Sequence, residues 1–240
     1  MRVAVVIPAY DASRHVAAVI ERVLAAPVPD LDRVIVVNDG SRDDTARIVA
    51  ELPRGRCPVE LVDRPRNGGY GAAMKDGLAR AAETDPDVVA CVHADGQYSP
   101  EALPSLLDAM QTGGLDLLQG SRIASGSALS GGMPIYKYVA NAALNVLENR
   151  ALGLRMTDYH SGYLLYGRRL RESVPFARLS DSFDFDLEVI ASARACGLAV
   201  AEAPVPTRYA DEISHLRPVP YGLRVLRVLW RFRRGHYAPS

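Results

Sequence analysis

Residues 3–8 read Val-Ala-Val-Val-Ile-Pro, and this apolar, largely β-branched run decides the fold. A run without polar alternation is typical of a strand that is buried on both faces, as strands are in a parallel sheet. A stripe of apolar residues at helical spacing follows, and we expect Ser13 to cap that helix and Pro27 to stop it. We therefore predict that the chain opens with a strand and a helix.

The same unit then repeats along the first half of the chain. The expected strands are 34–37, 59–62 and 88–92, and the helices between them are 43–52 and 72–82. This alternation predicts a doubly wound, mostly parallel α/β sheet, in which ligands bind beyond the carboxyl ends of the strands. The loops that we expect to meet in one crevice are 8–11, 38–41, 67–71 and 93–97.

The second half follows a less regular pattern. We expect a Gly- and Ser-rich loop at 121–132, strands at 115–119, 162–166 and 198–201, and helices at 133–152 and 183–195. Neither a linker nor an internal repeat separates the halves, so we predict a single domain over residues 1–212. Residues 213–240 form a basic amphipathic segment after it.

The composition excludes several classes of protein. The chain has 240 residues, 48% of them hydrophobic and 23% charged, with 28 basic and 28 acidic residues. These values exclude a disordered chain, and the balanced charge gives no overall attraction to nucleic acid. Because no signal peptide and no apolar run of about 18 residues stands out, we expect a cytoplasmic protein that is at most peripheral to a membrane.

A glycine-rich loop and a polar turn are the main candidate sites. Asn67-Gly-Gly-Tyr-Gly71 lies between a strand and a helix, where backbone N–H groups can cradle a phosphate, although a plain tight turn fits the spacing equally well. The turn His93-Ala-Asp-Gly-Gln97 follows a buried strand. If it is extended, His93, Asp95 and Gln97 project to one side and form a corner for Mg²⁺ or Mn²⁺. The alternative is that Asp95 only caps the next helix.

These motifs together resemble a known family. In chain order stand Val-Ile-Pro-Ala-Tyr at 6–10, Val-Asn-Asp-Gly-Ser at 37–41, Asn-Gly-Gly-Tyr-Gly-Ala-Ala at 67–73 and Ala-Asp-Gly-Gln at 94–97. This succession resembles the inverting family-2 glycosyltransferases of the GT-A fold, and within them the polyprenyl-phosphate, or dolichol-phosphate, sugar synthases. The resemblance continues at 158–162, 183–188 and 202–206 and ends at 208–214. It implies a Rossmann-like sheet with a nucleotide-binding half at 1–112 and an acceptor half at 113–212.

The resemblance also implies roles for individual residues at the donor site. Pro8, Ala9 and Tyr10 would line the pocket of the nucleotide base, and Asp39 would contact the base or the ribose. Asp95 would hold the divalent ion that bridges the two phosphates, with Gln97 assisting and His93 as a third candidate ligand. The residues that we assign to the nucleotide sugar are Pro8, Ala9, Tyr10, Asp11, Asp39, Gly69, Lys75, Ala94 and Asp95.

The implied acceptor site lies in the second half. The residues that would meet the acceptor or a phosphate are Arg122, Arg208, Ser214 and His215. Asp95 and Arg208 are also catalytic candidates, because the metal and the arginine would balance charge that develops on the leaving diphosphate. A surface ion pair is the alternative role of Arg208.

This chain departs from the family pattern at two positions. Asp11-Ala12 stands where the family usually has Asn-Glu, so the resemblance does not decide between uracil and guanine in the donor. His93 stands where the usual Asp-x-Asp begins, which leaves Asp95 as the main anionic ligand of the metal.

The acceptor decides whether a catalytic base is needed. A hydroxyl acceptor requires a carboxylate to take its proton, whereas a polyprenyl phosphate is already ionised. Residues 181–188 offer four carboxylates, among which Asp184 is our candidate base. The alternative is that most acidic residues of this helix are solvated, with Phe183, Leu187 and Ile190 as its core stripe.

The C-terminal segment gives a further indication of the acceptor. Arginines recur at 224, 227, 231 and 234, while apolar residues fill the rest of a predicted helix around Trp230. This pattern fits a helix at an anionic membrane surface, and it also fits a helix docked on the domain with arginine stems at its rim.

We therefore expect a metal-dependent enzyme that transfers a sugar from a UDP- or GDP-sugar to a polyprenyl phosphate. Two alternatives stay open. One is transfer to a soluble hydroxyl acceptor, such as a natural product or a polysaccharide precursor. The other is a sugar-nucleotide-binding protein without catalysis, for which His93 would be the sign of a degenerate site.

Overall fold

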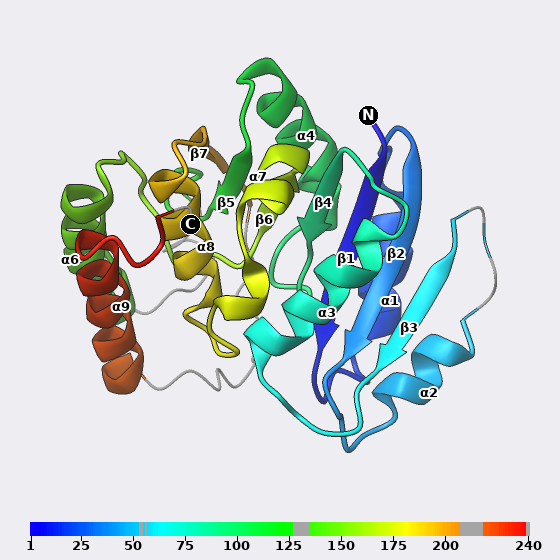
Figure 1. The fold of residues 1–240 in the computed structure, drawn as a ribbon. Coiled ribbons are helices and arrows are strands. Elements are labelled where there is room, and N and C mark those ends of the chain that lie inside the picture. The colour runs from blue at the N-terminus through cyan, green and yellow to red at the C-terminus, as the bar shows by residue number, and fades with distance from the viewer. Residues whose placement is uncertain (53–54, 56, 127–134, 207–217, 239–240) are drawn as a thin grey trace.

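The computed structural model describes residues 1–52, 55, 57–126, 135–206 and 218–238 (Figure 1). Its seven strands are β1 Val3–Ala9, β2 Leu31–Asn38, β3 Val59–Asp63, β4 Val88–Cys91, β5 Leu117–Ser121, β6 Leu164–Gly167 and β7 Val200–Pro204. The α-helices are α1 Val16–Ala25, α2 Thr45–Ala50, α3 Tyr70–Ala82, α4 Leu103–Thr112, α6 Ile135–Leu152, α7 Arg168–Ser173, α8 Phe185–Ala195 and α9 Pro218–Arg233. Two short 3₁₀ helices lie at Pro100–Ala102 and Phe176–Arg178.

The strands form one mixed sheet in the order β3-β2-β1-β4-β6-β5-β7. The pairs β1–β2, β1–β4, β2–β3 and β5–β7 are parallel, whereas β6 runs antiparallel to both β4 and β5. The predicted α/β fold with a mostly parallel sheet is therefore confirmed. Strands from both halves of the chain share this sheet.

Two hydrophobic layers cover the two faces of the sheet, because successive side chains of a strand point to opposite faces. Ala4 and Val6 of β1 pack into a layer with α3, α6, α8 and α9. Val3, Val5 and Ile7 pack into the other layer with α1, α2 and α4. The uninterrupted apolar run at the start of the sequence is thus explained by burial on both faces.

The ends of several elements differ from the sequence prediction. Helix α1 begins at Val16 and no side chain caps it, so the expected cap by Ser13 is wrong. The backbone N–H of Ser13 instead donates to Oδ2 of Asp43 at 3.0 Å. Helix α3 begins at Tyr70, two residues before the expected start at Ala72, and its N-cap Gly69 has φ of 98°, which favours glycine.

Helix α8 is more deeply buried than its sequence suggests. Nine of its residues are buried, including Asp186 and Glu188, and its N-cap Asp184 is also buried. The expectation of a largely solvated acidic helix is therefore wrong, because α8 is covered on several sides by α3, α9 and the sheet. Phe183, which was expected in the core stripe, is 44% exposed, whereas Leu187 and Ile190 are buried.

Helices α6 and α9 lie side by side at the end of the molecule away from β3 (Figure 1). Val225, Val228 and Leu229 of α9 are buried in the same layer as α8. Within the ranges that the structure describes, no helix has the length and apolar character of a membrane span.

Candidate active site

The loops after β1, β2 and β4 meet at one edge of the sheet, the lower edge in Figure 1. They meet because the three strands are parallel neighbours, with Ala9 beside Asn38 and Val6 beside Cys91. Most residues assigned to the nucleotide and the metal lie at these strand ends, whereas Gly69 caps α3 and Lys75 lies within it. The sheet topology therefore gathers the predicted donor residues at the crevice where such folds bind ligands.

The loop after β1 is held against the loop after β2. The backbone N–H of Asp11 donates to Oγ of Ser41 at 2.9 Å, and Oδ1 of Asp11 accepts from the N–H of Arg42 at 2.8 Å. Asp11 has φ of 48°, a left-handed conformation that aspartate tolerates better than most residues. Ala9 is buried, Pro8 and Tyr10 are partly exposed, and Asp11 is exposed.

Asp39 ties the end of β2 to the glycine-rich loop. Its Oδ1 accepts from the N–H of Gly68 and its Oδ2 from that of Gly69, both at 2.9 Å, and Arg64 forms an ion pair with the same carboxylate. A phosphate cradle on the N–H groups of Gly68 and Gly69 is therefore wrong, because both are already bonded. The loop is a turn that Asp39 holds in place.

The polar turn after β4 is not extended. The chain turns at residues 94–95, and Gly96 has φ of 71°. Oδ1 of Asp95 accepts from the backbone N–H of Gln97 at 3.0 Å, so Asp95 closes its own turn and does not cap the next helix. The expectation that His93, Asp95 and Gln97 project to one side of an extended segment is wrong. Ala94 between them is buried.

His93 points into the protein from this turn. Its ring lies between those of Tyr70 and Tyr98, with ring centroids 5.4 and 5.5 Å away, and its Nε2 faces Gly162. Burial lowers the pKa of His93, which favours the neutral ring. Among the described residues, no group of three or more His, Cys, Asp or Glu side chains converges in the manner of a protein metal cage.

A small cavity of about 70 Å³, lined by aromatic and polar side chains, lies behind His93. Asp186 of α8 lines it and accepts from the hydroxyl of Tyr70 at 2.9 Å and from that of Tyr166 at 3.4 Å. Burial raises the pKa of Asp186 to about 7, against the opposing effect of the two tyrosine hydroxyls. The sequence did not single out Tyr70 or Asp186, because they lie 116 residues apart and only the fold brings them together.

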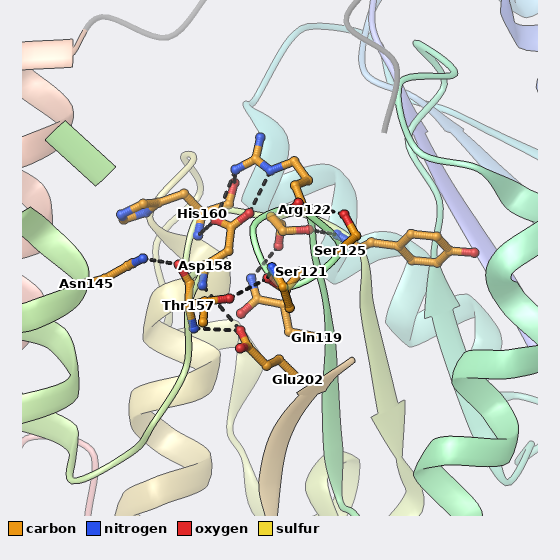
Figure 2. Close-up of polar contacts among 12 residues, drawn as sticks. Gln119, Ser121, Arg122, Ser125, Asn145, Thr157, Asp158, His160 and Glu202 are labelled. Carbon is orange, nitrogen blue, oxygen red and sulfur yellow. Dashed lines mark hydrogen bonds and ion pairs between the residues drawn. The ribbon is translucent and has the colours of Figure 1, made fainter. Parts of the chain in front are cut away.

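Arg122 follows β5 and forms an ion pair with a buried carboxylate. It forms a bidentate pair with Asp158, Nε to Oδ2 at 2.7 Å and Nη2 to Oδ1 at 3.0 Å, and Nη2 also donates to the carbonyl of His160 at 3.2 Å (Figure 2). Both side chains are buried. The guanidinium that we expected at the acceptor is therefore held in one orientation by Asp158.

The segment around Asp158 is fixed from several directions (Figure 2). Gln119 of β5 donates to the carbonyl of Ser161 at 2.6 Å, and the hydroxyls of Ser121 and Thr157 lie 2.7 Å apart. Glu202 of β7 accepts from the N–H of Thr157 at 2.8 Å. These contacts join β5, the segment 157–161 and β7, and the signals for them in the sequence were the motifs at 158–162 and 202–206.

Two further residues of the predicted site, Lys75 and Asp184, contact other groups of the protein. The ammonium of Lys75 contacts Oδ1 of Asp181 at 2.8 Å and the carbonyl of Leu179 at 2.5 Å, which joins α3 to the segment before α8. Oδ1 of Asp184 accepts from the hydroxyl of Ser180 at 2.8 Å and from Arg224 at 3.2 Å. Asp184 faces α9, whereas Asp186 faces the cavity behind His93.

Arg208, Ser214 and His215 lie outside the described residues, as do residues 127–132 of the predicted loop.

Comparison with known proteins identifies the family. Residues 4–174 match the family described as Glycosyl transferase family 2. The chain is 32% identical over 228 residues to a low-salt glycan biosynthesis hexosyltransferase of Haloferax volcanii, with 94% of this chain and 52% of that protein covered. It is 30% identical over 206 residues to a polyprenol monophosphomannose synthase of Mycolicibacterium smegmatis, with 85% of this chain and 76% of that protein covered.

A solved structure shares the fold. It is a crystal structure of glucosyl-3-phosphoglycerate synthase from Mycobacterium tuberculosis in complex with Mn²⁺, uridine-diphosphate and phosphoglyceric acid. The TM-score is 0.69 at 20% identity, and 100% of this chain and 80% of that chain are covered. This chain spans about half the length of the Haloferax protein and more of the other two. From the sequence match and the shared GT-A fold, we conclude that the chain belongs to glycosyl transferase family 2.

Proposed function

We propose that this chain is an inverting glycosyltransferase that moves a sugar from a UDP- or GDP-sugar to a polyprenyl phosphate. The proposal depends on one observation: in a family-2 chain, Asp39 follows β2 and Asp95 follows β4, the two strands that flank β1 in the sheet. The similarity to a polyprenol monophosphomannose synthase supports polyprenyl phosphate as the acceptor. Attack on the anomeric carbon from the side opposite the diphosphate inverts that carbon.

In this proposal the first half binds the nucleotide. Pro8, Ala9 and Tyr10 flank the base, and Asp39 lies at the ribose end of the same crevice. Asp11 and Asp39 are both fixed by backbone N–H groups before any ligand arrives. Such preorganisation lowers the entropy that binding has to overcome.

The turn after β4 fits a divalent cation that has few protein ligands. Asp95 is partly exposed at the sheet edge, and Mg²⁺ commonly binds one or two carboxylates together with the phosphates of a substrate. Asp95 and Gln97 would hold Mg²⁺ or Mn²⁺, and His93 would join them only if its ring left Tyr70 and Tyr98. When bound, the metal would neutralise charge on the leaving diphosphate.

The four carboxylates of residues 181–188 all have partners within the protein. Asp181 pairs with Lys75, and Asp184 with Ser180 and Arg224. Asp186 accepts from two tyrosines, and Glu188 from the N–H of Ser180 and the hydroxyl of Tyr237, both at 2.6 Å. The choice of a phosphate acceptor, which arrives ionised and needs no base, therefore depends on the similarity to the polyprenol monophosphomannose synthase and not on these carboxylates.

The surface of α6 and α9 supports a location at the cytoplasmic face of a membrane. Large apolar side chains are exposed on both helices, namely Ile135, Val139, Val146, Leu147, Leu223, Leu226 and Trp230. The one acidic residue of the two helices, Glu148, is buried. An apolar surface with cations and no exposed carboxylate suits an anionic lipid layer.

Transfer is tested with purified protein, UDP- and GDP-linked hexoses, a short polyprenyl phosphate, and either Mn²⁺ or EDTA. We expect lipid-linked sugar from one donor with Mn²⁺ and none with EDTA. Asp95→Asn should lower the rate at least about a hundredfold, because the metal loses its main anionic ligand. Product formation at the full rate in EDTA would reject metal dependence.

Asp184→Asn separates the two acceptor classes. We expect it to keep transfer to polyprenyl phosphate within about threefold, since a phosphate needs no base. Loss of turnover with donor binding intact would favour the hydroxyl acceptor. Failure of both UDP and GDP to bind, measured by calorimetry with Mn²⁺, would favour a module without catalysis.

A further inference from the structure

A second groove of about 350 Å³ lies between α9 and the segment that leads into α8. It is separate from the cavity behind His93, and the two share no lining residue. Four arginines and two carboxylates line it, namely Arg178, Arg224, Arg227, Arg231, Asp184 and Glu188. This lining gives the groove an excess of two positive charges.

Two of the arginines are fixed by buried acids. Arg224 pairs with Asp184 at 3.2 Å, and Arg231 pairs with Glu188 at 3.2 Å. Because each carboxylate takes few of the five N–H donors of a guanidinium, donors remain on both side chains for a ligand. The buried acids therefore orient the arginines without using up their hydrogen-bonding capacity.

The other two arginines have no such partner. Within the described part of the chain, Arg178 and Arg227 form no ion pair, and both are exposed at the groove. Arg224, Arg227 and Arg231 follow one another at helical spacing, so they lie on one face of α9. The groove thus combines two fixed guanidinium groups with two unpaired ones.

We propose that this groove binds a phosphate monoester, at a site separate from the donor crevice. A phosphate monoester carries a charge of about −1.5 to −2 at pH 7, which matches the excess positive charge of the lining. Arginine forks bind phosphate oxygens in pairs, which gives both strength and orientation. The proposal does not depend on the proposed transferase activity.

The position of the groove on α9 favours a lipid headgroup as the source of the phosphate. Leu226 and Trp230 of the same helix are 47% and 58% exposed, and they neighbour Arg227 and Arg231 in sequence. A lipid whose phosphate enters the groove can place its acyl chains against this apolar side. A soluble phosphate ester shares the same headgroup chemistry, and the experiment distinguishes the two.

The test compares two double variants of equal charge. Arg178→Gln with Arg227→Gln removes the two unpaired arginines of the groove. Arg150→Gln with Arg233→Gln removes two exposed arginines of α6 and α9 that do not line it. All four positions are exposed and form no ion pair among the described residues, so we expect both variants to fold, which thermal melting checks.

Binding is measured by calorimetry with inorganic phosphate and by the fluorescence of Trp230, the single tryptophan, with vesicles of phosphatidic acid or of phosphatidylcholine. We expect the groove variant to bind phosphate at least about tenfold more weakly than the wild type, and the control variant to bind it unchanged. A blue shift with phosphatidic acid that only the groove variant loses identifies a lipid source. Phosphate binding without that shift identifies a soluble source.

Two results would overturn the proposal. If both double variants weaken binding equally, general positive charge explains it and the groove is not a site. If the groove variant binds phosphate as tightly as the wild type, the anion is held elsewhere. Neither result bears on sugar transfer, which is assayed separately.

Discussion

At the scale of single residues, Asp39 shows how one carboxylate joins distant parts of the chain. It is buried at the end of β2 and accepts from Gly68 and Gly69, while Arg64 completes the cluster. Gly40 next to it has φ of 67° and lies so close to the backbone of Arg66 and Asn67 that a Cβ would not fit. The end of β2 and the glycine-rich loop are therefore a single unit.

Replacement of Asp39 tests this unit. We expect Asp39→Ala to lower the free energy of unfolding by about 2–4 kcal/mol, because two backbone N–H groups and a guanidinium lose their acceptor. Asp39→Asn keeps one acceptor oxygen and should cost less. Urea denaturation measures both, and equal losses for the two variants would contradict this account.

At the scale of elements, glycine has opposite effects in two helices. In α3, a Cβ at Gly77 would collide with Val6 of β1 and lie 3.2 Å from Val37 of β2, so the helix packs closely on the sheet. In α9, a Cβ at Gly222 would meet nothing within 4 Å. The same residue type is required at one position and only lowers helix propensity at the other.

Alanine at these two positions makes a matched pair. Gly77→Ala should destabilise the protein by about 1–3 kcal/mol through overpacking. Gly222→Ala should stabilise it by about 0.5–1 kcal/mol, because alanine loses less backbone entropy in a helix. Thermal unfolding decides the signs, and a stabilising Gly77→Ala would refute the close packing of α3.

At the scale of the whole molecule, a buried polar cluster joins α6, the loop before β6, and α9. Nδ1 of His160 lies 2.9 Å from the hydroxyl of Tyr221, and Nε2 lies 3.5 Å from Oε2 of Glu148. Burial raises the pKa of Glu148 to about 8 and lowers that of His160 to about 4. Both groups are therefore neutral near pH 6, so this contact is not an ion pair.

This cluster makes stability depend on pH. An unfolded glutamate releases its proton near pH 4.5, whereas folded Glu148 keeps it until about pH 8, so the contribution of Glu148 to the free energy of unfolding falls as pH rises through that window. His160, whose pKa is lowered from 6.5 to about 4, contributes in the opposite direction between those two values. Glu148→Gln removes the glutamate ionisation. The free energy of unfolding of the variant should therefore be higher than that of the wild type by roughly 3–5 kcal/mol at pH 8.5, with little difference at pH 4. Urea denaturation across this range checks it, and parallel profiles would contradict the assignment.

Much of the fold could be predicted because local patterns and burial agree in this chain. The strands β1 and β4 and the helices α3 and α8 were located to within two residues, since their apolar runs are either continuous or at helical spacing, whereas β2 begins three residues before its predicted start. The cap by Ser13 and the extended turn at 93–97 were wrong. The cap failed because the Ser13 N–H has a distant partner, Asp43, whereas the turn at 93–97 is closed locally, by the bond from the Gln97 N–H to Asp95 and by the positive φ of Gly96.

Local hydrophobic runs and contiguous motifs were enough to predict an α/β fold with a mostly parallel sheet, the loops that follow its first strands, and the family, but not the strand order or the antiparallel direction of β6. The folded chain was needed to show which acidic residues are buried, that Arg122 pairs with Asp158, and that Asp186 and not Asp184 faces the cavity behind His93. It also produced the arginine groove between α8 and α9. Contacts between residues far apart in the chain depend on helix packing angles and burial, which no local pattern records.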